Sequence, residues 1–129
     1  MLVYYFTRTG RSKQIAESLA KKKKICALPI SDGKSWAGIF GYVKAAVAAL
    51  TGKNLPVSYE NPGEEANVVV VFPVWAGKLP PAMKTFVQEV GRERIIAIPT
   101  SLGSKLNDRE GFAKIVDLVG DEISAPENL

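Results

Sequence analysis

The residues best suited to chemistry follow the first apolar segment. Residues 2–6 are apolar or aromatic, and residues 7–12 then read Thr-Arg-Thr-Gly-Arg-Ser. If a strand ends here and a helix begins, the unpaired N–H groups of the first helical turn lie beside three hydroxyls and two guanidinium groups. This combination favours a bound anion, most simply a phosphate, because the helix dipole is positive at this end. Serine and threonine are also common helix caps, so an ordinary N-cap explains the segment equally well.

Two more polar segments follow apolar runs. Residues 73–78 and residues 100–104 each contain glycine, and the first of them also contains Trp75. A flat indole beside a phosphate site suits stacking on a planar heteroaromatic cofactor, whereas a tryptophan at the rim of the core is the plainer interpretation. Gly77 would let the backbone approach a ligand closely. The segment that starts at residue 100 supplies further amides and hydroxyls.

The hydrophobic pattern alternates strands with helices. Short apolar runs predict strands at residues 2–6, 25–30, 67–72 and 94–99. Apolar residues at helical spacing predict helices at residues 11–22, 35–50, 79–90 and 107–120. In the last helix, Asn107 and Glu110 resemble a capping box. Such alternation predicts a parallel α/β sheet, in which ligands bind beyond the carboxyl ends of the strands.

The composition excludes several classes of protein. The chain has 129 residues, 47% of them hydrophobic and 23% charged, which indicates a single domain spanning residues 1–129. No apolar run is long enough to span a membrane and no signal peptide is recognisable, so we expect a cytoplasmic protein. With no histidine and one cysteine, the usual catalytic triads and zinc sites are excluded, and we assign no catalytic residue and no metal site. We expect that cysteine, Cys26, to be buried within its strand.

The net charge of +4 is mild. The obvious basic run, Lys21 to Lys24, falls at the end of the first predicted helix, where cations interact favourably with the helix dipole. Binding of single-stranded nucleic acid would require aromatic residues among these lysines to stack on the bases, and there are none. We therefore expect no nucleic acid and no membrane among the partners.

Three segments resemble the flavodoxin family. "YYFTRTGRSKQIAESLA" resembles its phosphate loop, T/S-x-T-G-x-T, with Ser12 in the place of the last threonine. "VVVVFPVWAGKLPPAMKTFV" is similar to the second flavin loop and the helix after it, and "DGKSWAGIFGYVKAAVAALTGK" is similar to the second helix of short, stand-alone members. The resemblance covers most of residues 1–105. It implies a doubly wound, flavodoxin-like sheet of strand order 2-1-3-4-5 that binds flavin mononucleotide (FMN) noncovalently.

The resemblance also implies that three loops hold FMN. The first loop would bind the phosphate, Trp75 would stack on the isoalloxazine ring, and a backbone carbonyl near Ala76 or Gly77 would face a flavin nitrogen. The expected cofactor-binding residues are Thr7, Arg8, Thr9, Gly10, Arg11, Ser12, Pro73, Val74, Trp75, Ala76, Gly77, Thr100, Ser101, Leu102 and Gly103.

A protein of this kind transfers electrons, either as a small redox carrier or as an FMN-dependent reductase. Its partner would then be a redox protein or a nicotinamide donor. The alternative is a flavodoxin-fold interaction module that binds flavin weakly or not at all. Two departures from the family bear on this choice: the chain is basic where electron-carrying flavodoxins are usually acidic, and the third loop offers only Leu102 where an aromatic residue often stacks on the flavin. Whether the protein is an enzyme stays open.

A last helix is missing from the pattern. The nine residues after Gly120 allow a short fifth strand but no fifth helix. Because parallel crossovers are right-handed, the first helix lies on one face of the sheet and the later helices lie on the other. The face with a single helix would leave apolar side chains of residues 67–72 and 94–98 partly bare. We expect a homodimer that covers this face.

Overall fold

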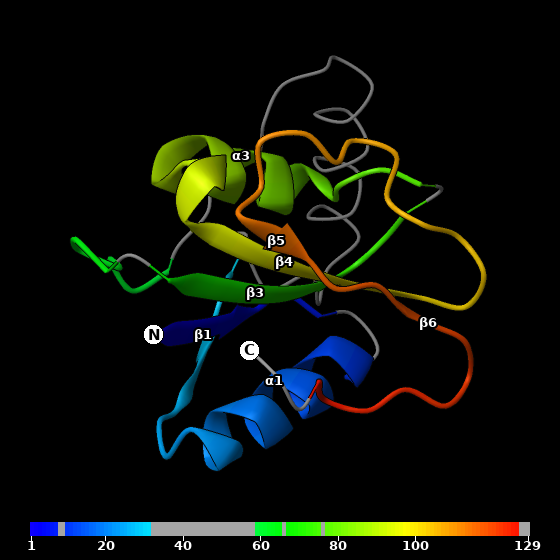
Figure 1. Cartoon of the computed structure of the whole chain (residues 1–129), viewed down its shortest axis with the longest axis horizontal. Coiled ribbons are helices and arrows are strands. Elements are labelled where there is room, and N and C mark those ends of the chain that lie inside the picture. Colours follow the sequence, from blue (N-terminus) through cyan, green and yellow to red (C-terminus); the bar gives the residue numbers. More distant parts are fainter. Residues whose placement is uncertain (8–9, 32–58, 66, 76, 127–129) are drawn as a thin grey trace, which may run out of the picture.

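The described chain forms a parallel sheet with helices on both faces (Figure 1). The computed structural model describes residues 1–7, 10–31, 59–65, 67–75 and 77–126. The strands are β1 (Leu2–Tyr5), β2 (Ala27–Pro29), β3 (Val68–Pro73), β4 (Ile95–Ser101), β5 (Lys114–Ile115) and β6 (Leu118–Val119). The helices are α1 (Arg11–Lys22), α3 (Pro81–Val90) and the short 3-10 helix η1 (Arg92–Arg94). The predicted helix at residues 35–50 lies outside the described residues.

The order of the strands confirms the predicted α/β fold. The sheet runs β2-β1-β3-β4-β5, with β6 also paired to β4, and all of these pairs are parallel. Residues 68–72 of β3 are all buried, as is typical of a central strand covered on both faces. The carboxyl ends of β1, β3 and β4 consequently lie side by side at one edge of the sheet.

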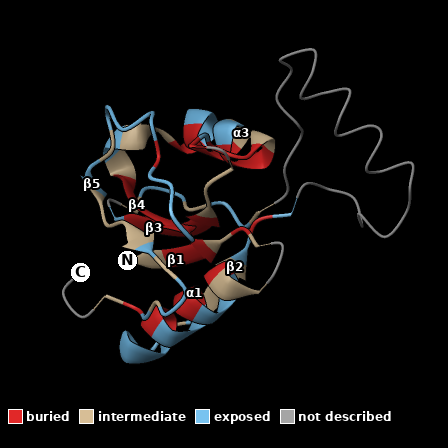
Figure 2. Ribbon diagram, turned by 90° about the vertical axis from the view of Figure 1, so that its right-hand side faces the viewer, coloured by how far each residue is buried: buried red, intermediate tan, exposed pale blue. Residues whose placement is uncertain are grey.

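The two helices pack their apolar stripes on opposite faces of the sheet (Figures 1 and 2). Ile15 and Leu19 of α1 join an apolar cluster with side chains of β1, β3 and β4. Met83 and Phe86 of α3 join a second cluster on the other face. Proline at the start of α3 and Gly91 at its end delimit this helix as predicted. The placement of α1 and α3 on different faces agrees with right-handed crossovers.

The predicted fourth helix is wrong. Residues 107–120 contain the two short strands β5 and β6, which both pair with β4. Gly111 has a φ of +87°, which is incompatible with a right-handed helix. Ile115, Val116 and Val119 are β-branched, and such residues favour extended backbone. The strand expected after Gly120 therefore comes before it.

Arg92 holds the start of this irregular segment. Its guanidinium group donates to both carboxylate oxygens of Asp108, at 2.8 and 2.6 Å, and to the carbonyl oxygen of Glu110 at 2.9 Å. The same group lies 4.7 Å from the centre of the Phe112 ring. The bond to the Glu110 carbonyl satisfies a backbone group that a helix would have satisfied internally.

The ion pair between Arg109 and Asp117 should make the free energy of unfolding fall at acidic pH. Arg109 donates to both carboxylate oxygens at 3.0 and 2.7 Å, and these hydrogen bonds, together with its charge, hold the pKa of Asp117 below its usual value. A lowered folded-state pKa stabilises the fold fully above the unfolded pKa of about 4, and this contribution is lost as the pH falls through the folded pKa.

We therefore expect Asp117→Asn to lower the midpoint of urea unfolding at pH 7. The difference from the wild type should shrink as the pH is lowered from about 5 to about 2, where the wild-type carboxyl also becomes neutral. Urea titrations of both proteins across this range measure the effect. A difference that stays constant with pH would contradict the assignment.

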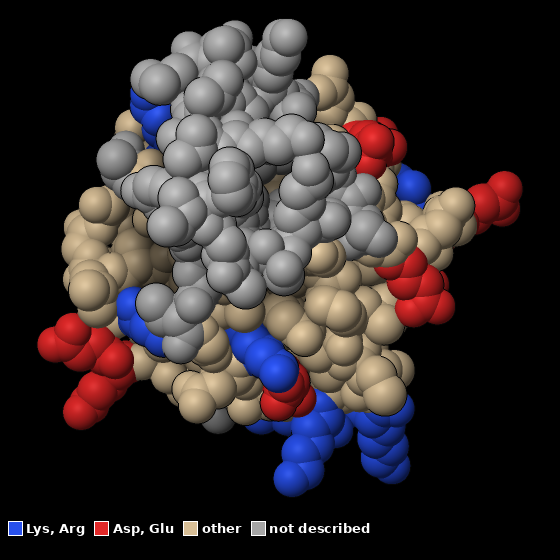
Figure 3. Space-filling view, turned by 180° about the vertical axis from the view of Figure 1, so that it is seen from behind, with Lys and Arg blue, Asp and Glu red and all other residues tan. Residues whose placement is uncertain are grey.

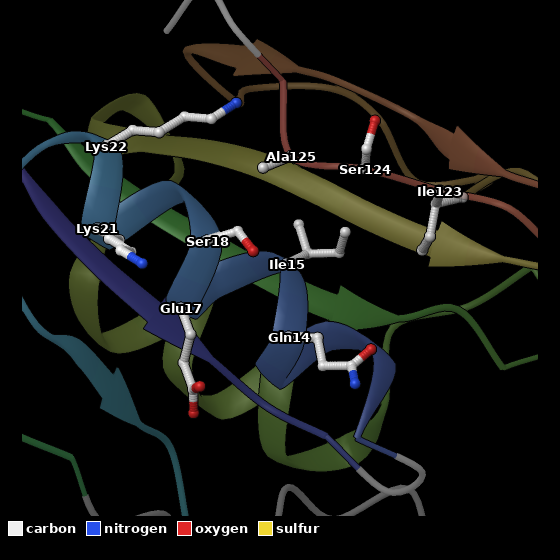
Figure 4. Close-up of a pocket in the computed structure, with 9 residues that line it drawn as sticks. All are labelled: Gln14, Ile15, Glu17, Ser18, Lys21, Lys22, Ile123, Ser124 and Ala125. Atoms are coloured by element: carbon white, nitrogen blue, oxygen red, sulfur yellow. The ribbon is translucent and has the colours of Figure 1, made fainter.

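The C-terminal segment covers the sheet face that was expected to be partly bare. Ile123 and Ala125 pack beside α1 in the same apolar cluster as Val71 and Ile98 (Figure 4). Val71 and Ile98 are both 0% exposed. The expectation of a bare face is thus wrong, because chain without helical structure provides the missing cover.

The reason given for a homodimer no longer applies, although association of two chains stays a prediction that sedimentation equilibrium tests. What remains on this face is a shallow groove between α1 and the C-terminal segment. Figure 4 shows its lining residues, and none of them belongs to the predicted cofactor site.

Two surface features complete the fold. Cys26 is exposed just before β2, so the expectation that it is buried is wrong. Lys21 and Lys22 occupy the last turn of α1 as predicted, and Figure 3 shows basic side chains gathered along the lower edge of the molecule. Within the described ranges, no helix is long and apolar enough to cross a membrane, and no group of three or more His, Cys, Asp or Glu side chains could hold a metal ion.

Candidate functional site

The turn between β1 and α1 is built around Thr7 and Gly10. The Gly10 N–H donates to Thr7 Oγ1 at 2.9 Å, and Gly10 precedes α1 with a φ of +93°, which favours glycine. No side chain in the described part of the chain caps the first turn of α1. This end of the helix therefore presents N–H groups suited to an anion. Arg8 and Thr9 lie outside the described residues.

Arg11 and Ser12 connect the start of α1 to the end of β4 and to Gly120, which follows β6. The Arg11 guanidinium donates to the carbonyl of Gly120, whose own N–H donates to the Ser101 carbonyl at 2.9 Å. Ser12 is buried, and its Oγ lies 3.0 Å from Thr100 Oγ1. The first and third predicted loops are thus in direct contact.

The second loop forms a tight turn beside the third. The Val74 N–H donates to the Thr100 carbonyl at 3.0 Å, which continues the ladder between β3 and β4 beyond Pro73. Trp75 and Lys78 exchange two backbone hydrogen bonds, each of 3.0 Å. Ala76 lies outside the described residues.

Trp75 packs on the rim of the core, and stacking on a cofactor stays a prediction. Its ring centre lies 6.1 Å from that of Phe6, with the ring planes inclined at 59°, so part of the indole packs on the rim of the core. The residue is only partly buried. Trp75 therefore has both a fixed contact with the core and accessible surface at the carboxyl edge of the sheet.

Asn107 contacts the second loop, and the sequence did not predict this contact. Its N–H donates to the Gly77 carbonyl at 2.8 Å, so this carbonyl is already engaged within the protein. Gly77 has a φ of +79°, and a Cβ added there would lie 2.7 Å from Asn107 Nδ2. Nothing in the local spacing of the sequence indicates this contact, which joins residues 30 positions apart.

We expect Gly77→Ala to destabilise the protein by about 1–2 kcal/mol, because the added methyl group meets Asn107 and the left-handed backbone conformation disfavours alanine. Urea unfolding measures the change. Gly103→Ala is the matched control: Gly103 has no positive φ, and its added Cβ meets nothing within 4 Å. Equal midpoints for the two variants would contradict the role given to Gly77.

The third loop differs from its expected role. Thr100 and Ser101 are buried, and the Ser101 hydroxyl donates to the Ser104 carbonyl. These hydroxyls satisfy groups of the protein itself. Leu102 is 67% exposed, and Gly103 beside it is also exposed. The accessible part of the loop is therefore an apolar side chain and backbone.

The described site residues thus meet at one edge of the sheet, as predicted from the strand order. The edge combines an uncapped helix start, a partly buried indole and an exposed leucine. Such an arrangement can bind an anionic group at α1 and a flat apolar group beside it. Asn107 and Gly120 are the supporting residues that sequence reasoning missed.

Comparison with known proteins gives structural matches alone. No protein-family model matches the chain, and no curated protein matches it in sequence. A flavoprotein from Lactobacillus acidophilus, solved in complex with FMN, matches with a TM-score of 0.63 and 16% identity, over 93% of this chain and 91% of that one. A candidate flavoprotein from Bacteroides uniformis matches with a TM-score of 0.67 and 20% identity, over 94% and 90% of the two chains.

A third match, a candidate flavoprotein from Bacteroides eggerthii, has a TM-score of 0.66 and 18% identity, over 92% of this chain and 84% of that one. At these identities the likeness concerns the fold. The chain has the α/β fold of these flavoproteins, with the strand order expected of a flavodoxin-like protein.

Proposed function

We propose that this protein binds FMN noncovalently at the carboxyl edge of β1, β3 and β4 and transfers electrons. The observation that carries the proposal is that the start of α1, which no described side chain caps, and Trp75 both lie at this edge of the sheet. The structural neighbour from Lactobacillus acidophilus, which contains FMN, supports the choice of flavin. When bound, FMN supplies one- and two-electron redox chemistry that the side chains of the protein do not provide.

The described residues fit the two ends of FMN. The N–H groups at the start of α1 suit the phosphate, and Thr7 can add a donor because its bond with Gly10 uses only the hydroxyl oxygen. Trp75 offers a flat surface to the isoalloxazine ring, and the exposed Leu102 offers apolar surface at the same edge of the sheet. Electrons would come from a nicotinamide donor or pass to and from a redox protein.

The test begins with the purified protein mixed with FMN. Binding should give a visible spectrum of protein-bound oxidised flavin that survives gel filtration. Rapid reduction by a nicotinamide donor would then identify a reductase, whereas reduction only through a partner protein would identify a carrier. A protein that retains no flavin at micromolar FMN would contradict the proposal and favour a flavodoxin-fold interaction module.

A further inference from the structure

Two buried hydroxyls join the start of α1 to the end of β4. Ser12 is 2% exposed and Thr100 is 3% exposed, and their hydroxyl oxygens lie 3.0 Å apart although the residues are 88 positions apart in the chain. Thr100 Oγ1 also lies 3.3 Å from the carbonyl oxygen of Phe72 in β3. One chain of hydrogen bonds therefore spans α1, β4 and β3.

The number of protons on the two hydroxyls determines which group donates in each of these hydrogen bonds. A hydroxyl has a single proton to donate, and a carbonyl oxygen can only accept. The contact with Phe72 therefore uses the proton of Thr100, and the contact between the hydroxyls uses the proton of Ser12. The opposite direction would leave the Phe72 contact without a proton.

We propose that Ser12 donates to Thr100, and Thr100 to Phe72, so that the pair locks α1 onto β4 and makes Thr100 a positioning residue for the amide donors of the helix. The Ser12 hydroxyl then has no proton left for an anion. Thr7 differs, because it accepts from the Gly10 N–H and keeps its own proton. The part of this inference that concerns an anion rests on the proposed binding of FMN.

The lock is tested first without flavin, by urea unfolding of Ser12→Ala, Thr100→Val and the double variant. Each single variant should lower the midpoint, and the double variant should fall little below Thr100→Val, because Thr100→Val already breaks both the shared bond and the bond to Phe72. Thr100→Ser, which keeps the hydroxyl, should restore most of the loss caused by Thr100→Val. Midpoint losses that simply add in the double variant would overturn the lock.

The second measurement is the ratio of the dissociation constants of riboflavin and FMN, which a merely structural role would not change. Ser12→Ala and Thr100→Val should lower this ratio by a similar factor, about threefold to tenfold, through misplaced amides. A large fall of this ratio in Ser12→Ala, with no fall in Thr100→Val, would identify Ser12 as a direct donor to the phosphate and overturn the proposal. An unchanged ratio in both would overturn the positioning role.

These two measurements separate the inference from the proposed function. A wild-type protein that binds neither flavin would end the proposed function and the positioning role together. The urea result would still decide whether the two hydroxyls form the lock.

Discussion

FMN is expected to bind at least about a hundredfold more tightly than riboflavin, because the phosphate gains two or more charge-assisted hydrogen bonds worth about 1.5–3 kcal/mol each. The donors are the N–H groups at the start of α1, with the Thr7 hydroxyl beside them. Quenching of flavin fluorescence, measured with both ligands, gives the two dissociation constants. Equal affinities would exclude a phosphate site at this helix.

Thr7→Val tests the hydroxyl of Thr7, which also accepts from the Gly10 N–H. It should weaken FMN binding by roughly tenfold and leave riboflavin binding unchanged, because riboflavin has no phosphate. Thr85→Val is the matched control: the Thr85 hydroxyl donates to the Pro81 carbonyl within α3 and is not part of the predicted site. A control variant that loses as much affinity as Thr7→Val would contradict a specific role for Thr7.

Trp75→Ala should weaken the binding of FMN and riboflavin alike, by roughly tenfold or more, since both ligands share the isoalloxazine ring and aromatic stacking is worth about 1–3 kcal/mol. This pattern differs from that of Thr7→Val, which affects FMN alone. Because Trp75 also packs on Phe6, Trp75→Phe serves as the control that keeps an aromatic side chain there. It should retain most of the affinity.

Tryptophan fluorescence tests whether Trp75 contacts the isoalloxazine ring directly. The chain has two tryptophans, and Trp36→Phe leaves Trp75 as the only one. Titration of this variant with FMN should quench the remaining emission in step with binding. Emission that does not change while flavin binds would show that Trp75 lies away from the ring.

The sequence predicted those parts of the fold that depend on local pattern. The alternation of apolar strands with amphipathic helices was enough to locate α1 and α3 and to place three loops at one edge of the sheet. The strand order followed from the family resemblance, and the helix faces followed from that order together with the handedness of parallel crossovers. Flavin binding and electron transfer stay predictions.

The segment at residues 107–120 shows where such reasoning fails. Asn107, Glu110 and apolar residues at helical spacing predicted a helix, but Arg92 engages Asp108 and the Glu110 carbonyl from outside the segment. The β-branched residues nearby then pair with β4. Contacts between distant residues decided the outcome, and no spacing within the segment reveals them.

The same limit applies to the candidate site. Thr7 and Ser12 indicated hydroxyls at a phosphate, and Thr100 indicated a further hydroxyl in the third loop. Nothing in the sequence signalled that Ser12 and Thr100 would bond to each other. Asn107 reaches Gly77 in the same way. Sequence pattern identified the edge of the sheet where the candidate site lies, and tertiary contacts determine which hydroxyls still have a proton to offer.

The cover that the C-terminal segment gives to the sheet has a consequence for synthesis on the ribosome. Val71 and Ile98 are buried in a cluster that includes Val116, Leu118, Ile123 and Ala125. Before these residues leave the ribosome, α1 is the only element among the described residues that shields this side of the sheet. The nascent chain therefore presents a strip of valine and isoleucine to solvent, which is the kind of surface that chaperones bind and that promotes aggregation. Translation pauses before residue 116 should accordingly prolong chaperone contact, and pauses after residue 126 should not.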